Sequence, residues 1–437
     1  MIALSREFTR DEFRALRERA IFDCGKLDPH AFDAPTIAPF ALRLAPSAWN
    51  GLAALAERCA AELERARAAL AADSAHWRAL GISRRMRAVL GARRAPDARD
   101  PRFMRFDFHP TEEGWRASEV NADVPGGFIE AGALTRAVAE RLPALACPPD
   151  PAALLAESVA ARLASCGRGG DVALVHATSY TDDQQVMRRI GAELARLGVS
   201  SHFAAPDHVA PAADGGCALS TNGARIGAVV RFFPAEWLEN LPRAARLRWR
   251  EIDARVPQAN PLSALLVQSK RLPLVLSRLG LPTPVWSSVL PQVRAIGLRR
   301  FARSIAPAGL VLKPSWGRVG EGVAMEGVTE HRAARRAEWS ARVAPRHWLL
   351  QRRFESKAIG EQRVHACLGV YVIDGRAAGV YARVAERPLI DGRAQDAAVL
   401  LDPSLDPSLD ATGDSTGDPP RTQRAASLSK ELHHARH

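Results

Sequence analysis

The stretch RFDFHPTEEGWRASEVNAD, residues 105–123, decides how the rest of the chain is interpreted. Two runs that alternate in polarity flank the segment EEG, residues 112–114, which is typical of a β-hairpin. A three-residue turn would place Gly114 in a left-handed conformation. The strands nevertheless carry polar residues where a hairpin in a protein core should carry apolar ones, so this hairpin is a candidate functional site.

Strand alternation assigns the polar residues of this hairpin to one face. That face would hold Arg105, Asp107 and His109 on the first strand and Trp115, Ala117, Glu119 and Asn121 on the second. The three-residue turn pairs Asp107 with Glu119 and Arg105 with Asn121. Like charges on directly opposite residues are destabilising, and a divalent cation would relieve that repulsion. Two carboxylates and an amide oxygen form a hard ligand set that suits magnesium. The alternative is an exposed polar face on which Arg105 neutralises one acid.

The composition indicates an ordinary globular protein without a membrane span. The chain has 437 residues, enough for two or three packed domains, with 47% hydrophobic and 25% charged residues. No apolar run approaches the ~18 residues that cross a bilayer. The N-terminus has scattered charges and no apolar core of a signal peptide, so we expect a cytoplasmic protein. The six cysteines lie far apart and predict neither a zinc site nor a disulfide framework.

The formal net charge of +12 does not by itself predict a nucleic-acid partner. The basic residues are nearly all arginine, and they are spread along the chain instead of clustering with aromatic residues. Attraction of an anionic small substrate is a better use for this charge. A basic scaffold that binds nucleic acid is the least favoured interpretation.

Changes of pattern along the chain predict four regions. Residues 1–165 combine helices with the hairpin, and residues 402–437 form a polar, disordered tail. Residues 168–258 contain a strand–helix–strand unit that predicts a small α/β domain with a parallel sheet. Residues 259–401 begin with a long helix, NPLSALLVQSKRLPLVLSRLG, and continue with antiparallel strands.

A glycine-rich segment, LVLKPSWGRVGEGV, is predicted to join two of those strands. It contains Gly317, Gly320 and Gly322 and has no Lys-Ser/Thr pair after the last glycine, so it is not a Walker A loop. A flexible glycine loop of this kind can close over phosphates through its backbone N–H groups, although such loops are also ordinary hairpin turns. In a chain with only five lysines, Lys313 and Lys270 remain lysine near this loop, which suggests phosphate contacts.

Together these segments resemble the glutathionylspermidine synthase family, whose synthetase domain is an ATP-grasp ligase. The family carries an Arg-x-Asp strand followed by Glu-x-Asn-x-Asp, as in RFDF…SEVNAD. FFPAEWL resembles its Tyr-Pro-x-Glu-Trp segment, and ANPLSALLVQSK resembles its Asn-Pro…Asn-Lys helix, with Ser269 replacing asparagine. LKPSWGRVGEGV resembles its glycine loop, with Val319 where glutamate is usual.

The resemblance implies a mixed α/β (α+β) fold with a permuted ATP-grasp architecture. In it, residues 168–258 are a small βαβ pre-ATP-grasp-like domain and residues 259–401 are an antiparallel-sheet nucleotide lobe. The order of the motifs supports the permuted arrangement. The polar residues of the hairpin precede the glycine loop by roughly two hundred residues, whereas ordinary ATP-grasp enzymes place the corresponding metal ligands after the loop.

The resemblance also implies roles for individual residues. The metal ligands would be Asp107, Glu119 and Asn121, and the catalytic cations would be Arg105 and Arg318. The ATP-binding residues would be Lys270, Lys313, Gly317, Gly320, Gly322 and Gln351, with Gln351 near the adenine.

We therefore expect an ATP- and Mg²⁺-dependent, ADP-forming ligase that joins a small-molecule carboxylate to an amine through an acyl phosphate. A peptide or thiol-peptide is the carboxylate class that the charge favours. We expect neither a nucleic-acid nor a membrane partner, and the sequence does not give the oligomeric state. The alternative is a non-catalytic ATP-grasp-like module that binds a nucleotide or a partner, since Val319 and the segment after Arg383 depart from the family.

Overall fold

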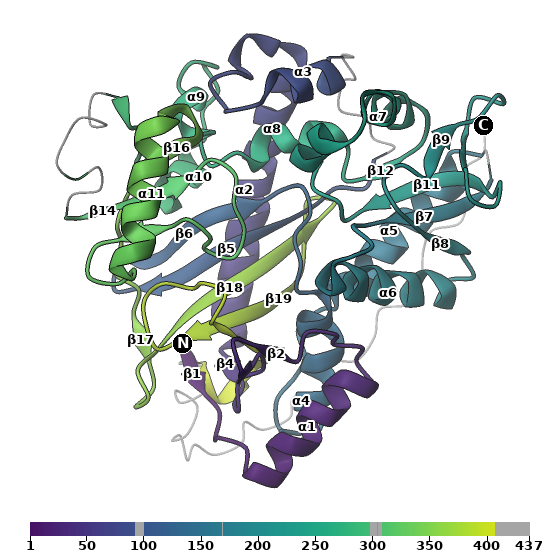
Figure 1. Ribbon diagram of the computed structural model, residues 1–437. Helices are drawn as coiled ribbons and strands as arrows, with labels where there is room; N and C mark the ends of the chain where they lie inside the picture. The colour runs from purple at the N-terminus through teal and green to yellow at the C-terminus, as the bar shows by residue number, and fades with distance from the viewer. Residues whose placement is uncertain (92–99, 168, 298–303, 305–307, 407–437) are drawn as a thin grey trace, which may run out of the picture.

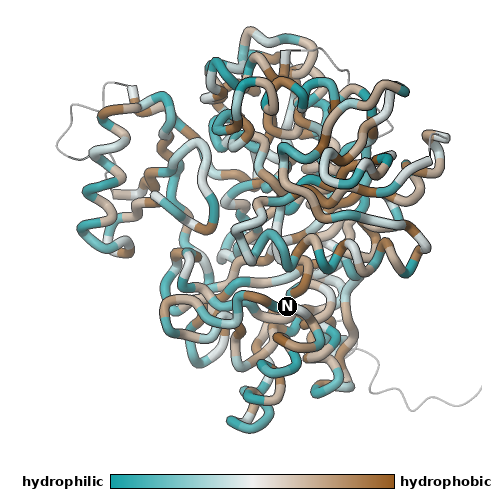
Figure 2. Tube along the Cα trace, turned by 45° about the vertical axis from the view of Figure 1, so that its right-hand side comes forward, coloured by the Kyte–Doolittle hydropathy of each residue, from teal (hydrophilic) through white to brown (hydrophobic). Residues whose placement is uncertain are grey.

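The computed structural model describes the chain except for residues 92–99, 168, 298–303, 305–307 and 407–437. It combines helices with several sheets, which confirms the predicted mixed fold class. Figure 2 shows hydrophobic segments in the interior and hydrophilic residues along the outer helices. Among the described residues, no helix is both long enough and apolar enough to cross a membrane.

The centre of the molecule is an antiparallel sheet in the order β20-β19-β18-β5-β6, with β17 also paired to β18. Its strands are β5 (Phe103–Thr111), β6 (Gly114–Asn121), β17 (Ala358–Ile359), β18 (Val364–Ile373), β19 (Arg376–Ala385) and β20 (Gln395–Ala397). The long helix α2 (Pro46–Ala72) packs against β18 and β19 (Figure 1). Strands from residues 358–397 thus share a sheet with the hairpin that begins at residue 103.

The hairpin has the predicted pairing at its far end but not the predicted turn. Thr111 pairs with Gly114, so the connection is two residues long. A β-bulge then leaves Ser118 unpaired, and beyond it Asp107 faces Glu119 as predicted. Because the extra residue reverses the alternation, the expectation that Trp115 and Ala117 share the polar face was wrong. Ala117 is instead fully buried in the hydrophobic core on the opposite side.

The predicted strand–helix–strand unit is confirmed by a parallel pair of strands. Strand β7 (Asp171–Val175) is followed by α6 (Thr181–Arg196) and by β8 (Ser201–Ala204), which lies parallel to β7. The sheet order is β8-β7-β11-β10-β9, with β12 beside β11. The remaining strands are β9 (Val209–Pro211), β10 (Cys217–Leu219), β11 (Arg225–Arg231) and β12 (Gln258–Ala259).

A second antiparallel sheet carries the glycine-rich segment. Its order is β13-β16-β14-β15, and its members are β13 (Val293–Ala295), β14 (Leu310–Pro314), β15 (Ala324–Met325) and β16 (Trp348–Arg352). The connection between β14 and β15 is the glycine loop, defined here as residues 315–323. Helix α11 (His331–Val343) packs on this sheet, at the left of Figure 1.

The single helix predicted for residues 260–280 is wrong. The segment forms η4 (Leu262–Ala264), α8 (Leu265–Gln268) and, after a break, α9 (Pro273–Leu276). Proline lacks the N–H that a continuous helix needs and favours the first helical turn, so Pro273 restarts the helix. At the break, Lys270 N–H donates to the Ser315 carbonyl at 3.2 Å, which ties this segment to the glycine loop.

The other elements surround these three sheets. The helices are α1 (Arg10–Phe22), α3 (Arg84–Leu90), α4 (Thr135–Ala139), α5 (Pro151–Ser165), α7 (Arg243–Arg255), α10 (Pro284–Val289), η1 (Ser74–His76), η2 (Glu130–Leu134), η3 (Ala235–Asn240), η6 (Pro345–His347) and η7 (Pro403–Leu405). Two small sheets comprise β1 (Ile2–Leu4), β4 (Leu42–Leu44) and β21 (Val399–Leu401), and β2 (His30–Ala31) with β3 (Ala34–Pro35).

The prediction of a disordered tail from residue 402 is wrong for its first residues. Residues 403–405 form η7, and Asp402 pairs with Arg43, so this part packs on the body of the protein. The rest of the predicted tail lies outside the described residues. The boundaries at residues 165, 258 and 401 stay a prediction.

A buried ion pair joins the hairpin to the α/β part. Arg231 and Asp123 are almost completely buried, and Arg231 Nη1 donates to Asp123 Oδ2 at 3.1 Å. The same oxygen accepts from the Ala235 N–H at 2.8 Å. Burying one of these charges without the other is strongly unfavourable, so the pair fixes the end of β6 against β11.

We predict that Asp123→Ala lowers the free energy of unfolding by about 3–5 kcal/mol, because it leaves the Arg231 charge buried and unpaired. Urea denaturation followed by circular dichroism measures the loss. The control is Asp11→Ala, which removes the exposed carboxylate paired with Arg14 and should cost less than about 1 kcal/mol. Equal losses in the two variants would contradict a special role for the buried pair.

Candidate active site

A cavity of about 900 Å³ brings the predicted site residues together. All but one of them line it: Arg105, Asp107, Glu119, Asn121, Lys270, Lys313, Gly317, Arg318, Gly320 and Gln351. Gly322 is the exception, and a Cβ at that position would meet Trp348 and Pro314. The lining side chains come from the hairpin, the glycine loop, β16 and the segment around α8, which are far apart in sequence.

Arg105 and Asp107 form a buried fork of hydrogen bonds on strand β5. Arg105 Nε and Nη2 donate to the two Asp107 oxygens at 2.7 and 2.9 Å, and Nη1 donates to the Gly126 carbonyl at 2.8 Å. Asn121 Nδ2 donates to Asp107 Oδ2 at 3.0 Å. Burial raises the pKa of Asp107 above its usual value, and the bidentate Arg105 guanidinium opposes that rise.

Glu119 lies opposite Asp107 and is surrounded by lysine ammonium groups. Its Oε2 is 2.9 Å from Lys270 Nζ. Although burial acts to raise it, the pKa of Glu119 is held below its usual value by Lys270 and Lys313. Burial, aided by the Lys270 charge, lowers the pKa of Lys313 to about 8. Lys270 and Lys313, which lysine scarcity singled out, thus lie next to Glu119, a predicted metal ligand.

The bulge residue Ser118 connects this cluster. Its Oγ lies 3.1 Å from His109 Nε2, and its carbonyl accepts from Lys313 Nζ at 3.3 Å. Burial lowers the pKa of His109 to about 3, so the ring is neutral near pH 7. His109 therefore lines the cavity as a neutral neighbour of the charged residues.

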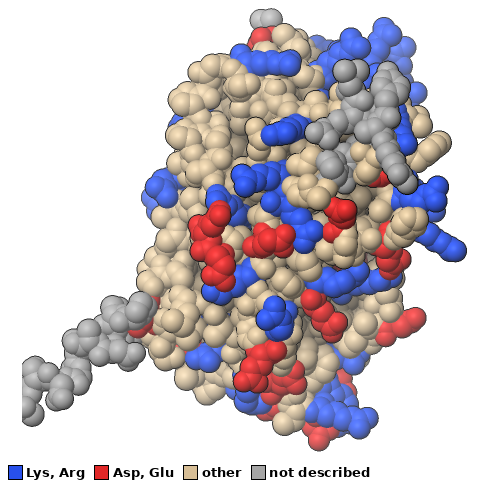
Figure 3. Space-filling view, turned by 90° about the vertical axis from the view of Figure 1, so that its left-hand side faces the viewer, with Lys and Arg blue, Asp and Glu red and all other residues tan. Residues whose placement is uncertain are grey.

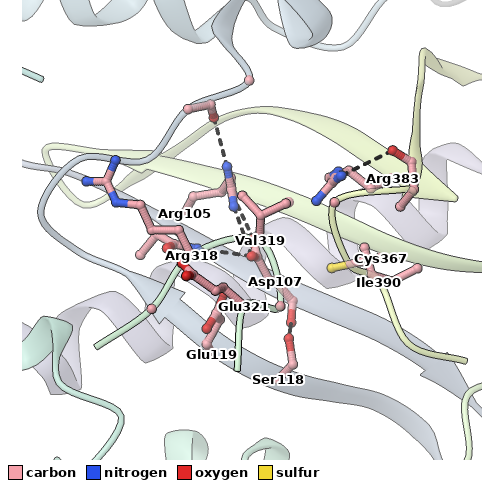
Figure 4. Close-up of a pocket in the computed structure, with 18 of the residues that line it drawn as sticks. Arg105, Asp107, Ser118, Glu119, Arg318, Val319, Glu321, Cys367, Arg383 and Ile390 are labelled. Atoms are coloured by element: carbon pink, nitrogen blue, oxygen red, sulfur yellow. Dashed lines mark hydrogen bonds and ion pairs between the residues drawn. The ribbon is translucent and has the colours of Figure 1, made fainter. Parts of the chain in front are cut away.

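The glycine loop crosses the cavity in a backbone conformation that suits glycine. Gly320 has φ +72°, and a Cβ there would lie 2.9 Å from the Ile390 carbonyl oxygen. Lys270 Nζ donates to the Gly317 carbonyl at 2.8 Å. In Figure 4 the loop residue Arg318 lies beside the hairpin residues Asp107 and Glu119. The loop is thus positioned next to the charged cluster.

Acidic residues that were not predicted as site residues line another part of the cavity. They are Asp28, Glu130, Asp182, Asp183, Glu236 and Asp396. Lys26 is completely buried behind them, with Nζ 2.6 Å from Glu130, 2.9 Å from Asp396 and 3.0 Å from Asp28. Lysine scarcity, which singled out Lys270 and Lys313, was the signal that could have found Lys26.

Asp182 and Asp183 follow the N-cap residue Tyr180 in the first turn of α6, and both line the cavity. His176 at the end of β7 is buried but does not line the cavity.

The residues predicted to hold magnesium fit a hard cation in their chemistry. Asp107 and Glu119 are paired across the hairpin, with the Asn121 side chain at Asp107. A carboxylate has about four lone-pair sites, so both acids retain acceptor capacity beyond their present partners. No group of three or more His, Cys, Asp or Glu side chains suited to a metal occurs in the described part of the chain. A metal site at these residues would therefore need the Asn121 amide oxygen as a third ligand.

Comparison with solved structures defines the class of fold. The structure of a glutathione synthetase-like effector from Globodera pallida matches with a TM-score of 0.61 and 12% identity, covering 89% of this chain and 96% of that one. A putative gamma-glutamylcysteine synthetase from Methylobacillus flagellatus matches with a TM-score of 0.42 and 10% identity, covering 77% of this chain and 87% of that one. The first match shows that the chain shares the fold of that glutathione synthetase-like protein.

The chain belongs to the glutathionylspermidine synthase preATP-grasp family, whose model matches residues 52–399. This confirms the resemblance inferred from the hairpin and loop motifs. The matched range contains all the predicted site residues, whereas Lys26 and Asp28 lie before it. No curated protein was found to match the sequence.

Lys313 generates a prediction about stability and pH. A lysine titrates near 10.5 when unfolded and near 8 here, so its charged form is disfavoured in the native state. That cost is complete below pH 8 and disappears as the pH rises towards 10.5. We expect Lys313→Met to be more stable than the wild type near pH 7, by on the order of 2 kcal/mol. The difference should shrink between pH 8 and pH 10.5.

Urea denaturation at several pH values tests this expectation. Lys357→Met is the matched control, because that lysine is half exposed at the surface beside Glu112. If the stability difference between Lys313→Met and the wild type does not change with pH, as expected for the control, then Lys313 titrates like a solvated lysine and the expectation is contradicted.

Proposed function

We propose that the protein is an ATP- and Mg²⁺-dependent carboxylate–amine ligase that releases ADP and phosphate. The observation that carries the proposal is the convergence, in one cavity, of the cations Arg105, Lys270 and Lys313 with the carboxylates Asp107 and Glu119. Such a mixture of fixed cations and hard oxygen ligands suits a metal-bound polyphosphate. Family membership supports a synthetase-type reaction.

In this proposal, each part of the nucleotide has its own partners in the cavity. Lys270 and Lys313 would contact the phosphates, and Gly317 and Gly320 would cover them with backbone N–H groups. Gln351, which is buried, lines the cavity with Val311 and Met325 on neighbouring strands of the same sheet. We assign the adenine to this less polar end.

Asp107, Glu119 and Asn121 would hold magnesium. A bound magnesium ion would offset negative charge on the phosphate oxygens and orient them. Arg105 is already fixed by Asp107 and by the Gly126 carbonyl, so its guanidinium needs little reorganisation to meet a developing negative charge. Lys270 and Lys313 would supply further fixed positive charge at the same oxygens.

The reaction proceeds in two displacements. A substrate carboxylate oxygen bonds to the γ-phosphorus of ATP as the bond from that phosphorus to the β–γ bridging oxygen breaks, and ADP leaves. The amine nitrogen then bonds to the acyl carbon as the carbon–oxygen bond to phosphate breaks, and the nitrogen loses a proton. The products are an amide, ADP and phosphate. The enzyme's contribution is to position the reactants and to balance their charge.

The substrates are small molecules, and the lining suggests where they bind. The acidic residues Asp28, Asp182 and Asp396 would favour a cationic amine, while the arginine side of the cavity would favour the carboxylate. A peptide or thiol-peptide remains our proposal for the carboxylate, and we place the reaction in the cytoplasm. Nucleic acid and membrane have no part in this proposal.

A non-catalytic nucleotide-binding module is the second candidate. Val319 favours it, since a β-branched residue with φ +52° stands on the loop where the family has glutamate. The complete set of charged residues in the cavity favours the ligase, because binding alone has little need of all of them.

We predict that the protein, given ATP, Mg²⁺ and pools of carboxylates and amines, forms ADP and phosphate only when both substrate classes are present. Chromatographic separation of ADP from AMP is the measurement. Asp107→Asn, Glu119→Gln and Arg105→Met should each lower kcat by ~100-fold or more, because each removes a fixed charge at the phosphates. The control Lys357→Met changes an exposed lysine outside the cavity and should keep full activity.

AMP and pyrophosphate as products would refute the acyl-phosphate mechanism. Tight ATP binding without turnover in any pool would favour the binding module. Unchanged kcat in one of the three cavity variants, with the fold verified by circular dichroism, would remove that residue from the mechanism.

A further inference from the structure

The glycine loop touches the α/β part of the protein through a cation–π contact. The Arg318 guanidinium carbon lies 5.2 Å from the centroid of the Trp237 ring. Trp237 belongs to η3, and its ring is packed by Tyr180 at 5.6 Å and Phe233 at 5.8 Å between centroids. Arg318 is thus held on an aromatic surface, and Trp237 and Tyr180 line the same cavity.

Two carboxylates with unused acceptor atoms line the cavity beside these aromatic rings. Asp183 is only 5% exposed, and neither its Oδ2 nor the Oε2 of Glu236 has a hydrogen-bond partner. Burial raises the pKa of Asp183 to about 6, and the Arg318 charge opposes that rise. Arg318 also opposes the raised pKa that burial and Asp123 give Glu236. Arg318 is therefore a cation that acts to lower the pKa of both carboxylates, although it donates a hydrogen bond to neither unpaired atom.

This cation cradle, defined as Trp237, Tyr180, Asp183 and Glu236, has the composition of a binding site for an organic cation. Aromatic faces attract alkylammonium and guanidinium groups. Buried acceptors without a partner carry a desolvation cost that an N–H donor removes. An ammonium group brings three N–H donors. The Arg318 guanidinium instead lies over the face of the Trp237 ring and donates to neither unpaired acceptor.

We propose that the cation cradle binds the ammonium group of the amine substrate and that Arg318 occupies it only until that substrate arrives. Entry of the amine displaces the guanidinium from Trp237 and frees Arg318 for the phosphates on the other side of the glycine loop. This inference rests on the proposed function, because it gives Arg318 its second position in the ligase reaction. It makes Arg318 an internal competitor of the amine, and Trp237 a positioning residue that holds the loop.

Competition of this kind has a measurable consequence. A ligand whose site is open for a fraction f of the time binds with its dissociation constant divided by f. If Arg318 covers the cradle for about nine-tenths of the time, its removal tightens amine binding about tenfold. A residue that helps to bind the amine would have the opposite effect when removed.

The test is calorimetric titration of the nucleotide-free full chain with 1,4-diaminobutane at pH 8. We expect Arg318→Met to bind the diamine about tenfold more tightly than the wild type. The matched control is Arg393→Met, because Arg393 carries the same charge and lies over another ring, that of Phe32, at 5.8 Å. The control should change the affinity less than twofold, which separates release of the cradle from a general gain of negative charge. Unchanged or weaker binding by Arg318→Met would overturn the proposal.

A second pair of variants tests the cradle itself. In the Arg318→Met background, Asp183→Asn and Trp237→Leu should each weaken diamine binding about tenfold or more, while circular dichroism verifies the fold. Retained affinity in both double variants would place the diamine elsewhere and overturn the proposal.

The ligase assay distinguishes this inference from the proposed function. If the wild type forms ADP but Arg318→Met does not bind the diamine more tightly, the proposed ligase function stands and the proposed displacement of Arg318 by the amine is refuted. Tighter diamine binding without ADP formation under any condition would support the cradle while the ligase reaction fails.

Discussion

One extra residue in a β-strand underlies the arrangement of the whole cavity. Ser118 bulges out of β6 and reverses the side-chain alternation, so Ala117 enters the core while Glu119 faces Asp107 across the hairpin. The bulge is also used directly, because its carbonyl accepts from Lys313 and its hydroxyl contacts His109. Without it, either the apolar or the charged half of β6 would lie on the wrong side of the sheet.

That pairing concentrates like charge, and the rest of the structure compensates for it. Arg105 is hydrogen-bonded to one carboxylate and Lys270 is paired with the other, while burial lowers the pKa of the neighbouring Lys313 to about 8. Most basic residues of the chain are arginine, yet two of its few lysines, Lys270 and Lys313, stand at this place among the carboxylates. A compact ammonium fits among carbonyl and carboxylate oxygens where a planar guanidinium would need a wider space. Basic side chains elsewhere are interspersed with acidic ones, as on the face in Figure 3.

Prediction from the sequence succeeded where local rules sufficed and failed where they did not. The turn at residues 112–113 was predicted one residue too long, yet Asp107 still faces Glu119, because the bulge restores the residue that the shorter turn removes. The helix predicted through Lys270 is broken, since Pro273 and the contact with Ser315 outweigh its helical periodicity. Asp183 was missed as part of the cavity wall, because nothing local indicates which distant carboxylates or rings a side chain will meet.

The sequence by itself determined the strand–helix–strand unit, the hairpin register around Asp107 and the family, because these follow from residue order, alternation and motif spacing. The tertiary structure alone decided that the glycine loop lies beside the hairpin, that Arg318 rests on Trp237 and that Lys26 is enclosed by three carboxylates. Those contacts join residues far apart in the chain. Which residues meet in these contacts depends on how three sheets pack around one cavity, and that packing depends on the shape and charge of the complete molecule.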